Sequence, residues 1–308
     1  MTAFYTHPAF LAHEMGPHHP ESPARLWAIN DHLTRKGLMP LLQMREPVVA
    51  SDADLLRVHD QTHLDFLTER SPKGKRYQAL DPDTAMNEHT LAAAYLAAGA
   101  VINAVDDVVL GRVRNAFCAV RPPGHHAERS TAMGFCFFNN IAVGADYALN
   151  VLGVQRVAII DFDVHHGNGT EDIFANDDRV LMVSTFEQEI YPFRGDIPLG
   201  KNMVNMPLQA YSNGSAMKEA VLAHWLPALN QFAPELIMVS AGFDAHREDD
   251  LSHLLWTDQD YAWLSEQIVL SAQKHCKGKI VSALEGGYAT EALARSVGYH
   301  IDALLVAG

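Results

Sequence analysis

The architecture of this chain is read most directly from Ile159-Ile160-Asp161-Phe162-Asp163-Val164-His165-His166-Gly167-Asn168-Gly169. An apolar run from Val157 to Ile160 predicts a buried strand, which ends in two carboxylates, two imidazoles and a glycine-rich turn. Burying so many ionisable groups is costly unless a metal or a partner satisfies them. Asp163 and His165 are two residues apart, so in extended chain they share one face, and Asp161 shares it too. The pattern predicts a metal site at the carboxyl end of a strand, where open α/β sheets bind ligands.

The length and net charge of the chain indicate a protein with a sizeable core that does not bind nucleic acid. The chain has 308 residues, enough for a sizeable core, and 23 basic against 37 acidic residues give it a net charge of −14. This charge disfavours nucleic acid as a partner, because phosphates need basic patches. It would suit a cationic substrate, although a solvated acidic surface is the simpler interpretation.

The chain is expected to be a cytoplasmic protein without a membrane span. It shows no apolar run of 18 residues, and residues 1–10 do not have the pattern of a secretory signal. Its three cysteines, Cys118, Cys136 and Cys276, have no metal-type spacing. They are therefore expected to be free thiols in a reducing compartment.

From residue 115 onward, strand-like and helix-like segments alternate. The expected strands are 116–120, 157–160, 180–185, 203–207, 236–240 and 280–284. The expected helices are 139–152, 169–175, 215–232 with a kink or end at Pro227, one opened by a capping box at Thr257, and 290–306. Before residue 115 the chain is predicted to be mostly helical, most clearly over 87–110. No linker divides the chain, so we expect one α/β domain, residues 1–308, with a mostly parallel sheet and helices on both faces.

Ionisable groups follow four of these expected strands, each time next to glycine. The four segments are Arg121-Pro122-Pro123-Gly124-His125-His126, Asp161 to His166, Ser240-Ala241-Gly242-Phe243-Asp244 and Glu285-Gly286-Gly287-Tyr288. Glycine lets the backbone approach a site closely. Four such strand ends in one chain predict a single site at one edge of the sheet.

At these positions the sequence resembles the histone deacetylase superfamily, specifically its class II branch and the bacterial deacetylase-like amidohydrolases. The matching segments span 19–26, 121–127, 134–140, 161–170, 242–245 and 284–288, in order and over nearly the whole chain. The resemblance implies the arginase/deacetylase-like α/β fold. It also implies zinc-dependent hydrolysis of the acetyl or acyl amide of an acyl-lysine side chain, releasing acetate and a free amine.

The resemblance also assigns roles to residues. Asp163, His165 and Asp244 would be the metal ligands, and three protein ligands with one open position are typical of catalytic zinc. Iron(II) and cobalt stay open as alternatives, because oxygen donors discriminate poorly among these metals. The catalytic groups would be His126 as general base and acid, His125 as its electrostatic partner, Asp161 and Asn168 as acceptors for His125 and His126, and Tyr288 as oxyanion donor.

Further residues match the substrate channel and a second cation site of the family. Gly134, Phe135 and Tyr191 would line the channel, where aromatic faces suit the methylene chain of an acyl-lysine. Leu251 would be the gatekeeper at its mouth, a position that is acidic in the polyamine-selective branch. A structural potassium ion would be held by Asp161, Asp163, His165, Ser184 and Thr185, partly through backbone carbonyls.

Three other functions remain to be compared with this one. An acetylpolyamine amidohydrolase would share the catalytic set and differ in its loops, and Glu248 or Asp250 could supply the acidic contact that Leu251 lacks. An inactive acyl-lysine binding module would need the loss of a ligand or of the tyrosine, and an arginase-type enzyme would need a second carboxylate set. The expected partner is therefore an acetylated lysine of a protein or peptide, or an acetylated small amine. The sequence leaves the oligomeric state open, including a homo-oligomer.

Overall fold

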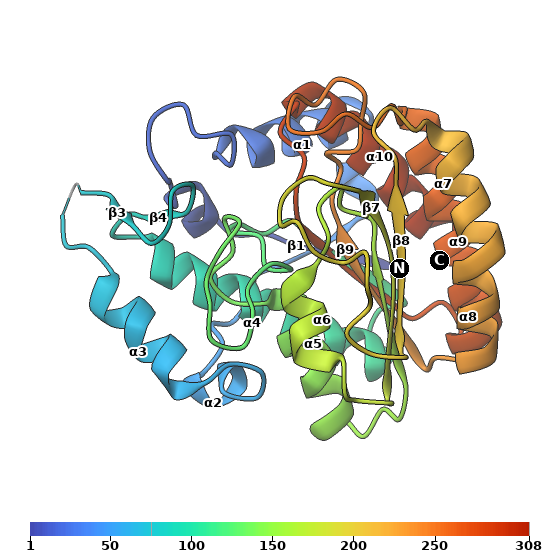
Figure 1. Ribbon diagram of the computed structural model, residues 1–308, viewed down its shortest axis with the longest axis horizontal. Helices are drawn as coiled ribbons and strands as arrows, with labels where there is room; N and C mark the ends of the chain where they lie inside the picture. Colours follow the sequence, from blue (N-terminus) through green and yellow to red (C-terminus); the bar gives the residue numbers. More distant parts are fainter. Residues whose placement is uncertain (75, 308) are drawn as a thin grey trace.

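An eight-stranded parallel sheet runs through the centre of the protein (Figure 1). The computed structural model describes residues 1–74 and 76–307. In sheet order the strands are β2 (Gln43–Arg45), β1 (Thr2–Tyr5), β5 (Asn115–Cys118), β10 (Ile280–Leu284), β9 (Leu236–Ala241), β6 (Val157–Asp161), β7 (Val180–Glu187) and β8 (Met203–Leu208). A separate antiparallel pair joins β3 (Gln78–Ala79) to β4 (Ala85–Met86).

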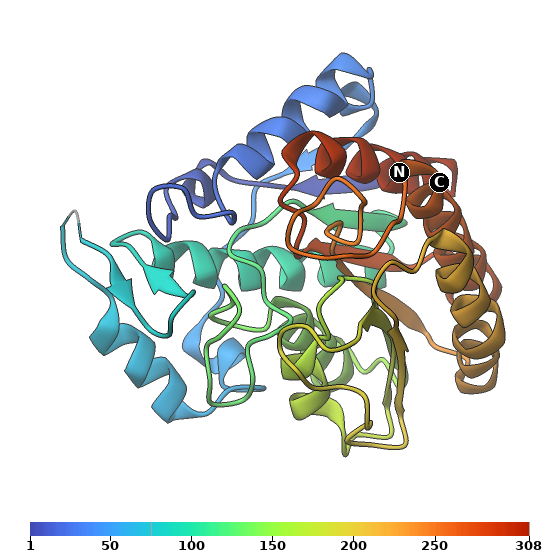
Figure 2. The same ribbon diagram turned by 45° about the horizontal axis from the view of Figure 1, so that its top comes forward.

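Helices cover both faces of the sheet, as the alternation of segments predicts. The helices are α1 (Ala24–Arg35), α2 (Asp52–Leu55), α3 (Gln61–Arg70), α4 (Thr90–Val109), α5 (Asn140–Asn150), α6 (Asn168–Phe174), α7 (Gly214–Ala220), α8 (Leu226–Phe232), α9 (Asp258–Cys276) and α10 (Thr290–Val306), with short 3-10 turns at Pro8–Leu11 and Met39–Leu41. Helices α1, α10 and α9 pack side by side on one face, and α4 packs against α5 on the other (Figure 2). The predicted single α/β domain with a mostly parallel sheet is confirmed.

The apolar runs become fully buried strands. All five residues of β6 and all eight of β7 are buried, because the helices on both faces exclude water from a parallel sheet. Helix α4 is long and apolar enough, by length and composition, to cross a membrane, but 72% of its most apolar window is buried inside the protein. Its small residues let it pack closely: a side chain at Gly99 would overlap the carbonyl of Val48. Helix α4 is therefore a core helix of this domain.

The N-terminal part of the chain differs from the prediction. Residues Thr2–Tyr5 form β1, which pairs with β2 and β5 inside the sheet, whereas we expected mostly helix before residue 115. A four-residue strand is too short to show a period of its own, and its two partners lie far along the chain. The expected helix over 215–232 also differs, because a π-helical turn at Val221–Trp225 separates α7 from α8, just before Pro227. An extra residue in that turn accommodates the proline without ending the helix.

The sheet order places the four ionisable strand ends next to one another. Strands β5, β10, β9 and β6 are consecutive neighbours in the middle of the sheet. All run parallel, so their carboxyl ends, and the segments that follow them, meet at one edge. The fold therefore gathers the predicted site residues at the centre of that edge.

Two buried histidines support the core away from the ligand cluster. The ring nitrogens of His300 contact the hydroxyls of Ser265 and Ser282 at 2.8 and 2.9 Å. His59 accepts a hydrogen bond from the Asn139 amide at 3.0 Å through Nε2. Burial lowers the pKa of His300 to about 4 and, with a smaller contribution from His63, that of His59 to about 3. Both rings are therefore neutral in the folded protein at neutral pH.

We expect the free energy of unfolding to fall as the pH drops below 6.5. Below this pH, histidines such as His300 and His59 are protonated in the unfolded chain but stay neutral in the folded protein. Each such group lowers the free energy of unfolding by up to about 1.4 kcal/mol per pH unit, until the pH reaches its pKa in the folded protein. Denaturant unfolding between pH 7.5 and 4.5 measures this slope. A His300→Gln variant, which pairs with a hydroxyl but takes no proton, should show a shallower slope. Equal slopes for the two proteins would contradict the assignment to His300.

Candidate active site

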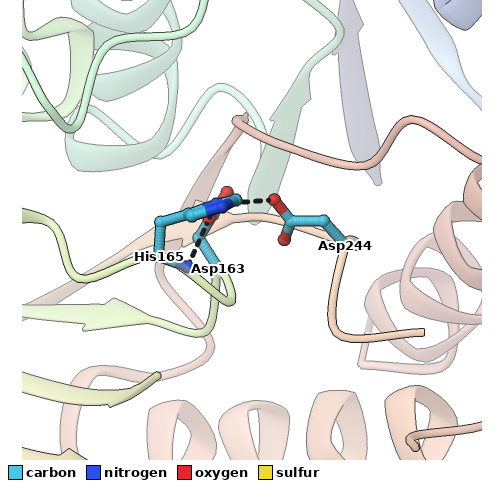
Figure 3. Close-up of side chains that lie close together, drawn as sticks. All are labelled: Asp163, His165 and Asp244. Atoms are coloured by element: carbon cyan, nitrogen blue, oxygen red, sulfur yellow. Dashed lines mark hydrogen bonds and ion pairs between the residues drawn. The ribbon is translucent and has the colours of Figure 1, made fainter. Parts of the chain in front are cut away.

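Three ligand-type side chains converge at the carboxyl ends of β6 and β9. Asp163 and His165 follow β6, and Asp244 follows β9 (Figure 3). The Nδ1 atom of His165 lies 3.1 Å from Asp163 Oδ1 and 3.1 Å from Asp244 Oδ2. One donor atom from each residue falls within 4.8 Å of the others. Over residues 1–74 and 76–307, this is the one cluster of three or more such groups that could hold a metal ion.

Glycines and backbone amides set the two carboxylates in place. A side chain at Gly242 would lie 2.1 Å from Asp163 Oδ2, and one at Gly286 would lie 2.1 Å from Asp244 Oδ2. The oxygens that face away from His165 accept backbone hydrogen bonds, Asp163 Oδ2 from Gly286 at 2.7 Å and Asp244 Oδ1 from Val164 at 3.0 Å. Each carboxylate thus keeps one oxygen directed at the shared centre.

The charges of the cluster fit a bound divalent cation. Burial and the nearby charge of Asp163 raise the pKa of Asp244 to about 6. Burial lowers the pKa of His165, but hydrogen bonds to both carboxylates outweigh it and raise the pKa to about 10. The proton that His165 holds supplies the positive charge that the two buried carboxylates need between them. A divalent cation bound by the carboxylate oxygens and the imidazole would supply that charge in place of the proton, and the donor set suits zinc, iron or cobalt.

A pair of histidines follows β5 and borders the cluster. His125 Nδ1 lies 3.0 Å from Asp161 Oδ2, and His126 Nδ1 lies 2.7 Å from Asn168 Oδ1. Burial lowers the pKa of His125, but the charges of Asp163 and Asp161 outweigh it and raise the pKa to about 10. For His126, burial and the neighbouring His125 lower the pKa well below its usual value. His125 is therefore the charged member of the pair and His126 the neutral one, able to accept a proton.

The surroundings of Asn168 determine which nitrogen of His126 carries the proton. Asn168 Nδ2 donates to Glu128 Oε1 at 2.8 Å, and the exposed Arg194 donates to that same oxygen at 2.6 Å. The amide oxygen of Asn168 therefore faces His126, so the proton of the neutral imidazole sits on Nδ1. The lone pair on Nε2 is left free to act as a base.

Tyr288 is held between a buried arginine and an aromatic ring. The guanidinium of Arg25 lies 5.0 Å from the centre of the tyrosine ring, and Phe135 meets that ring edge-on at 5.8 Å. Arg25 also donates hydrogen bonds to the carbonyls of Gly287, at 2.7 Å, and Glu285. Burial raises the pKa of Tyr288 well above its usual value. The phenol is therefore protonated at neutral pH and able to donate a hydrogen bond.

The predicted channel residues lie around these groups. The ring of Tyr191 stands 5.2 Å from His126 and 6.4 Å from His165, centre to centre. A side chain at Gly134 would come within 2.5 Å of His126 and 2.9 Å of Tyr191, so glycine is needed for the two rings to pass. Tyr191 also lines a cavity of about 510 Å³, together with Phe66, Leu80 and Met133. Leu251, the expected gatekeeper, is 39% exposed.

Comparison with known proteins gives the same family as the motifs. Residues 19–304 match the family described as "Histone deacetylase domain". The chain belongs to the histone deacetylase family. It is 38% identical to a "Probable deacetylase" of Archaeoglobus fulgidus, over 94% of this chain and 82% of that protein. It is 36% identical to a "Histone deacetylase-like amidohydrolase" of Pseudomonas aeruginosa, over 93% of this chain and 81% of that protein.

A solved structure supports the same relationship. The structure described as "Crystal Structure of HDA15 HD domain" matches with a TM-score of 0.91 and 34% identity, covering 98% of this chain and 90% of that chain. The predicted resemblance and fold are therefore confirmed. Membership in this family of deacetylases and amidohydrolases supports hydrolase activity on an acetylated amine.

The structure also reveals supporting residues of this deacetylase site to which the sequence assigned no role. Glu285 accepts hydrogen bonds from the amides of Gly124 and His125, at 2.6 and 3.1 Å, and so fixes the backbone of the histidine pair. Glu21 forms a buried ion pair with Arg25. Both acids lie inside segments that resemble the family. A charged residue next to a strand or helix that is expected to be buried is the sequence signal that could have indicated their supporting role. Glu128 offered no such signal, because its contact with Asn168 joins residues 40 positions apart.

Proposed function

We propose that this protein is a zinc-dependent deacetylase that hydrolyses the acetyl or acyl amide of acyl-lysine side chains. The proposal rests above all on the convergence of Asp163, His165 and Asp244 next to His126, with Tyr288 near enough that, besides burial, the charges of Asp163 and Asp244 raise its pKa. The aromatic rings of Phe135 and Tyr191 stand around these groups, which suits the apolar stem of a lysine. An inactive binding module is disfavoured, because every ligand and catalytic position of the family motif holds a competent residue.

Zinc would be held by Asp163, His165 and Asp244. When bound, it would polarise the acyl carbonyl and acidify the attacking water. His126 would take the proton from that water through Nε2 and later deliver it to the leaving amine. The charged His125, held by Asp161, would stabilise the negative charge that builds up beside it, and the hydroxyl of Tyr288 would donate to the oxyanion.

A structural potassium ion and a cytoplasmic location belong to the same proposal. The hydroxyls of Ser184 and Thr185 on β7 are buried without a hydrogen-bond partner, and Ser184 pairs in register with Asp161 on β6. Oxygen atoms left unpaired beside a buried carboxylate suit a hard monovalent cation. The buried free thiols Cys118, Cys136 and Cys276 support a reducing compartment such as the cytoplasm.

The loop that carries Leu251 favours acyl-lysine over an acetylated polyamine. The carboxylate of Glu248 forms an ion pair with Arg295 at 2.7 Å, so its charge is not available to a substrate at the channel mouth. Asp249 is buried and its carboxylate binds backbone amides. Asp250 is exposed, and it is the acid of these three to which we assign no contact. Leu251 can pack against a lysine stem or peptide backbone but cannot pair with a secondary ammonium.

We expect an acetyl-lysine peptide to be hydrolysed with higher catalytic efficiency than acetylspermidine or acetylputrescine. The measurement is kcat/KM for each substrate with the zinc-loaded protein, together with propionylated and trifluoroacetylated lysine peptides. A Leu251→Glu variant, with Asp250→Asn as the control, should shift the preference toward the polyamines. A wild-type preference for a polyamine of tenfold or more, about 1.4 kcal/mol in the transition state, would overturn the lysine assignment.

A further inference from the structure

Asp249 occupies an unusual position between the metal ligand Asp244 and the gate residue Leu251. Its side chain is 5% exposed although it lies in a surface loop. One carboxylate oxygen, Oδ2, accepts hydrogen bonds from the backbone amides of Tyr288 at 2.6 Å and Ala289 at 2.9 Å. The other oxygen, Oδ1, accepts one from the amide of Leu251 at 3.1 Å. The carboxylate of Asp249 thus joins the backbone at Leu251 to the backbone at Tyr288.

The segment around Tyr288 needs such an anchor. It follows Gly286 and Gly287, the second of which adopts a φ of +118°, so its own sequence restrains the backbone weakly. Helix α10 begins two residues later at Thr290, and its N-cap residue Ala289 provides no side-chain cap. Free amides at a helix start attract a negative group. From another part of the chain, Asp249 accepts a hydrogen bond from the N-cap amide of Ala289 and one from the amide of Tyr288, which precedes the cap.

The contacts on the two sides of this segment are complementary. Arg25 holds the carbonyls of Glu285 and Gly287, and Asp249 holds the amides of Tyr288 and Ala289. The neighbouring acids of the loop do not share this task. Glu248 turns outward to Arg295, and Asp250 is exposed.

We propose that Asp249 is a positioning residue that fixes the backbone of Tyr288 and the Leu251 gate through one carboxylate. The inference rests on the proposed function, in which the Tyr288 hydroxyl donates to the oxyanion. Asp249 does not touch the substrate in this scheme, and it acts through the tyrosine. A misplacement of about 1 Å at a reacting group costs on the order of a hundredfold in rate. Any movement of the gate backbone is therefore transmitted to the group that stabilises the transition state.

The first test is the Asp249→Ala variant. We expect kcat on an acetyl-lysine peptide to fall by about 10- to 100-fold, with KM changed less, because the lost interaction matters mainly in the transition state. Amide hydrogen exchange over residues 286–291 should become faster than in the wild type. The Glu248→Gln variant, which weakens only the outward contact with Arg295, is the matched control and should keep wild-type exchange there.

A second variant separates positioning from charge. Asp249→Asn removes the same negative charge near the metal ligands. Its amide oxygen can still accept from Tyr288 and Ala289, whereas its NH2 group cannot accept from the amide of Leu251. We expect this variant to retain most of the turnover that Asp249→Ala loses. An equal loss in the two variants, with equal metal content and with wild-type amide exchange over residues 286–291 in Asp249→Asn, would show that the charge matters and would overturn the positioning role.

The double variant Asp249→Ala/Tyr288→Phe completes the test. If Asp249 acts through the Tyr288 hydroxyl, the double variant should be no slower than Tyr288→Phe alone, within about threefold. Multiplicative losses would overturn the inference even in a protein that remains folded and metal-loaded. A wild-type protein that hydrolyses no acyl amide would instead overturn the proposed function, and the exchange measurement over 286–291 would still decide whether Asp249 anchors the segment.

Discussion

Replacing Asp244 with alanine is expected to abolish both metal retention and amide hydrolysis. Asp244 is one of three donors around the shared centre, and its loss leaves two. Metals contribute several kcal/mol of charge stabilisation in such reactions. Because about 1.4 kcal/mol corresponds to a factor of ten, the rate should fall by at least about a thousandfold. Metal content by elemental analysis and kcat on an acetyl-lysine peptide provide the two measurements.

Two controls separate the metal from the fold. Chelation of the wild-type protein should abolish hydrolysis, and zinc or cobalt should restore it, whereas neither ion should restore Asp244→Ala. Asp244→Asn keeps an oxygen that can accept from the Val164 amide, as Asp244 Oδ1 does at 3.0 Å, so it retains the local backbone while weakening the site. Full activity in a metal-free Asp244→Ala protein would refute the ligand assignment.

The central part of the fold could be predicted because each of its signals is local. Strand β6 is an apolar run that ends in charged residues, and the capping box predicted at Thr257 is present at the start of α9. Strand β1 escaped prediction because four buried residues, Thr2–Tyr5, carry no period, and only pairing with β5, more than a hundred positions away, makes them a strand. Strand order is also a long-range property, which is why the adjacency of the four motif strands needed the structure.

The residues of the candidate site also fall into two groups, those that local sequence could indicate and those that depend on long-range contacts. Asp163, His126 and Tyr288, to which we assign the chemistry, could be named as candidates because their types and motifs are distinctive. Residues that contact their backbone could not be named, because those contacts join distant parts of the chain. Asp249 lies 39 positions before Tyr288, from whose amide it accepts a hydrogen bond. A run of three acids, Glu248, Asp249 and Asp250, does not reveal which one turns inward.

The Tyr288→Phe variant is expected to keep its metal and bind substrate but to turn over about 10²- to 10³-fold more slowly. Phenylalanine retains the ring that packs against Arg25 and Phe135 and the backbone amide held by Asp249, so only the hydroxyl is removed. The loss should appear in kcat more than in KM, because the hydrogen bond to the oxyanion is strongest in the transition state.

The pH dependence of that loss gives a second, independent check. Burial keeps the pKa of Tyr288 well above its usual value, so the wild-type phenol stays protonated throughout the neutral range. The ratio of wild-type to Tyr288→Phe turnover should therefore be constant between pH 6 and 9, while both rates follow the same groups of the histidine pair. A variant with near wild-type turnover would show that the hydroxyl takes no part in the reaction. A ratio that changes with pH would show that Tyr288 exchanges a proton rather than donating a fixed hydrogen bond, and the proton transfers assigned to His126 would then have to be shared.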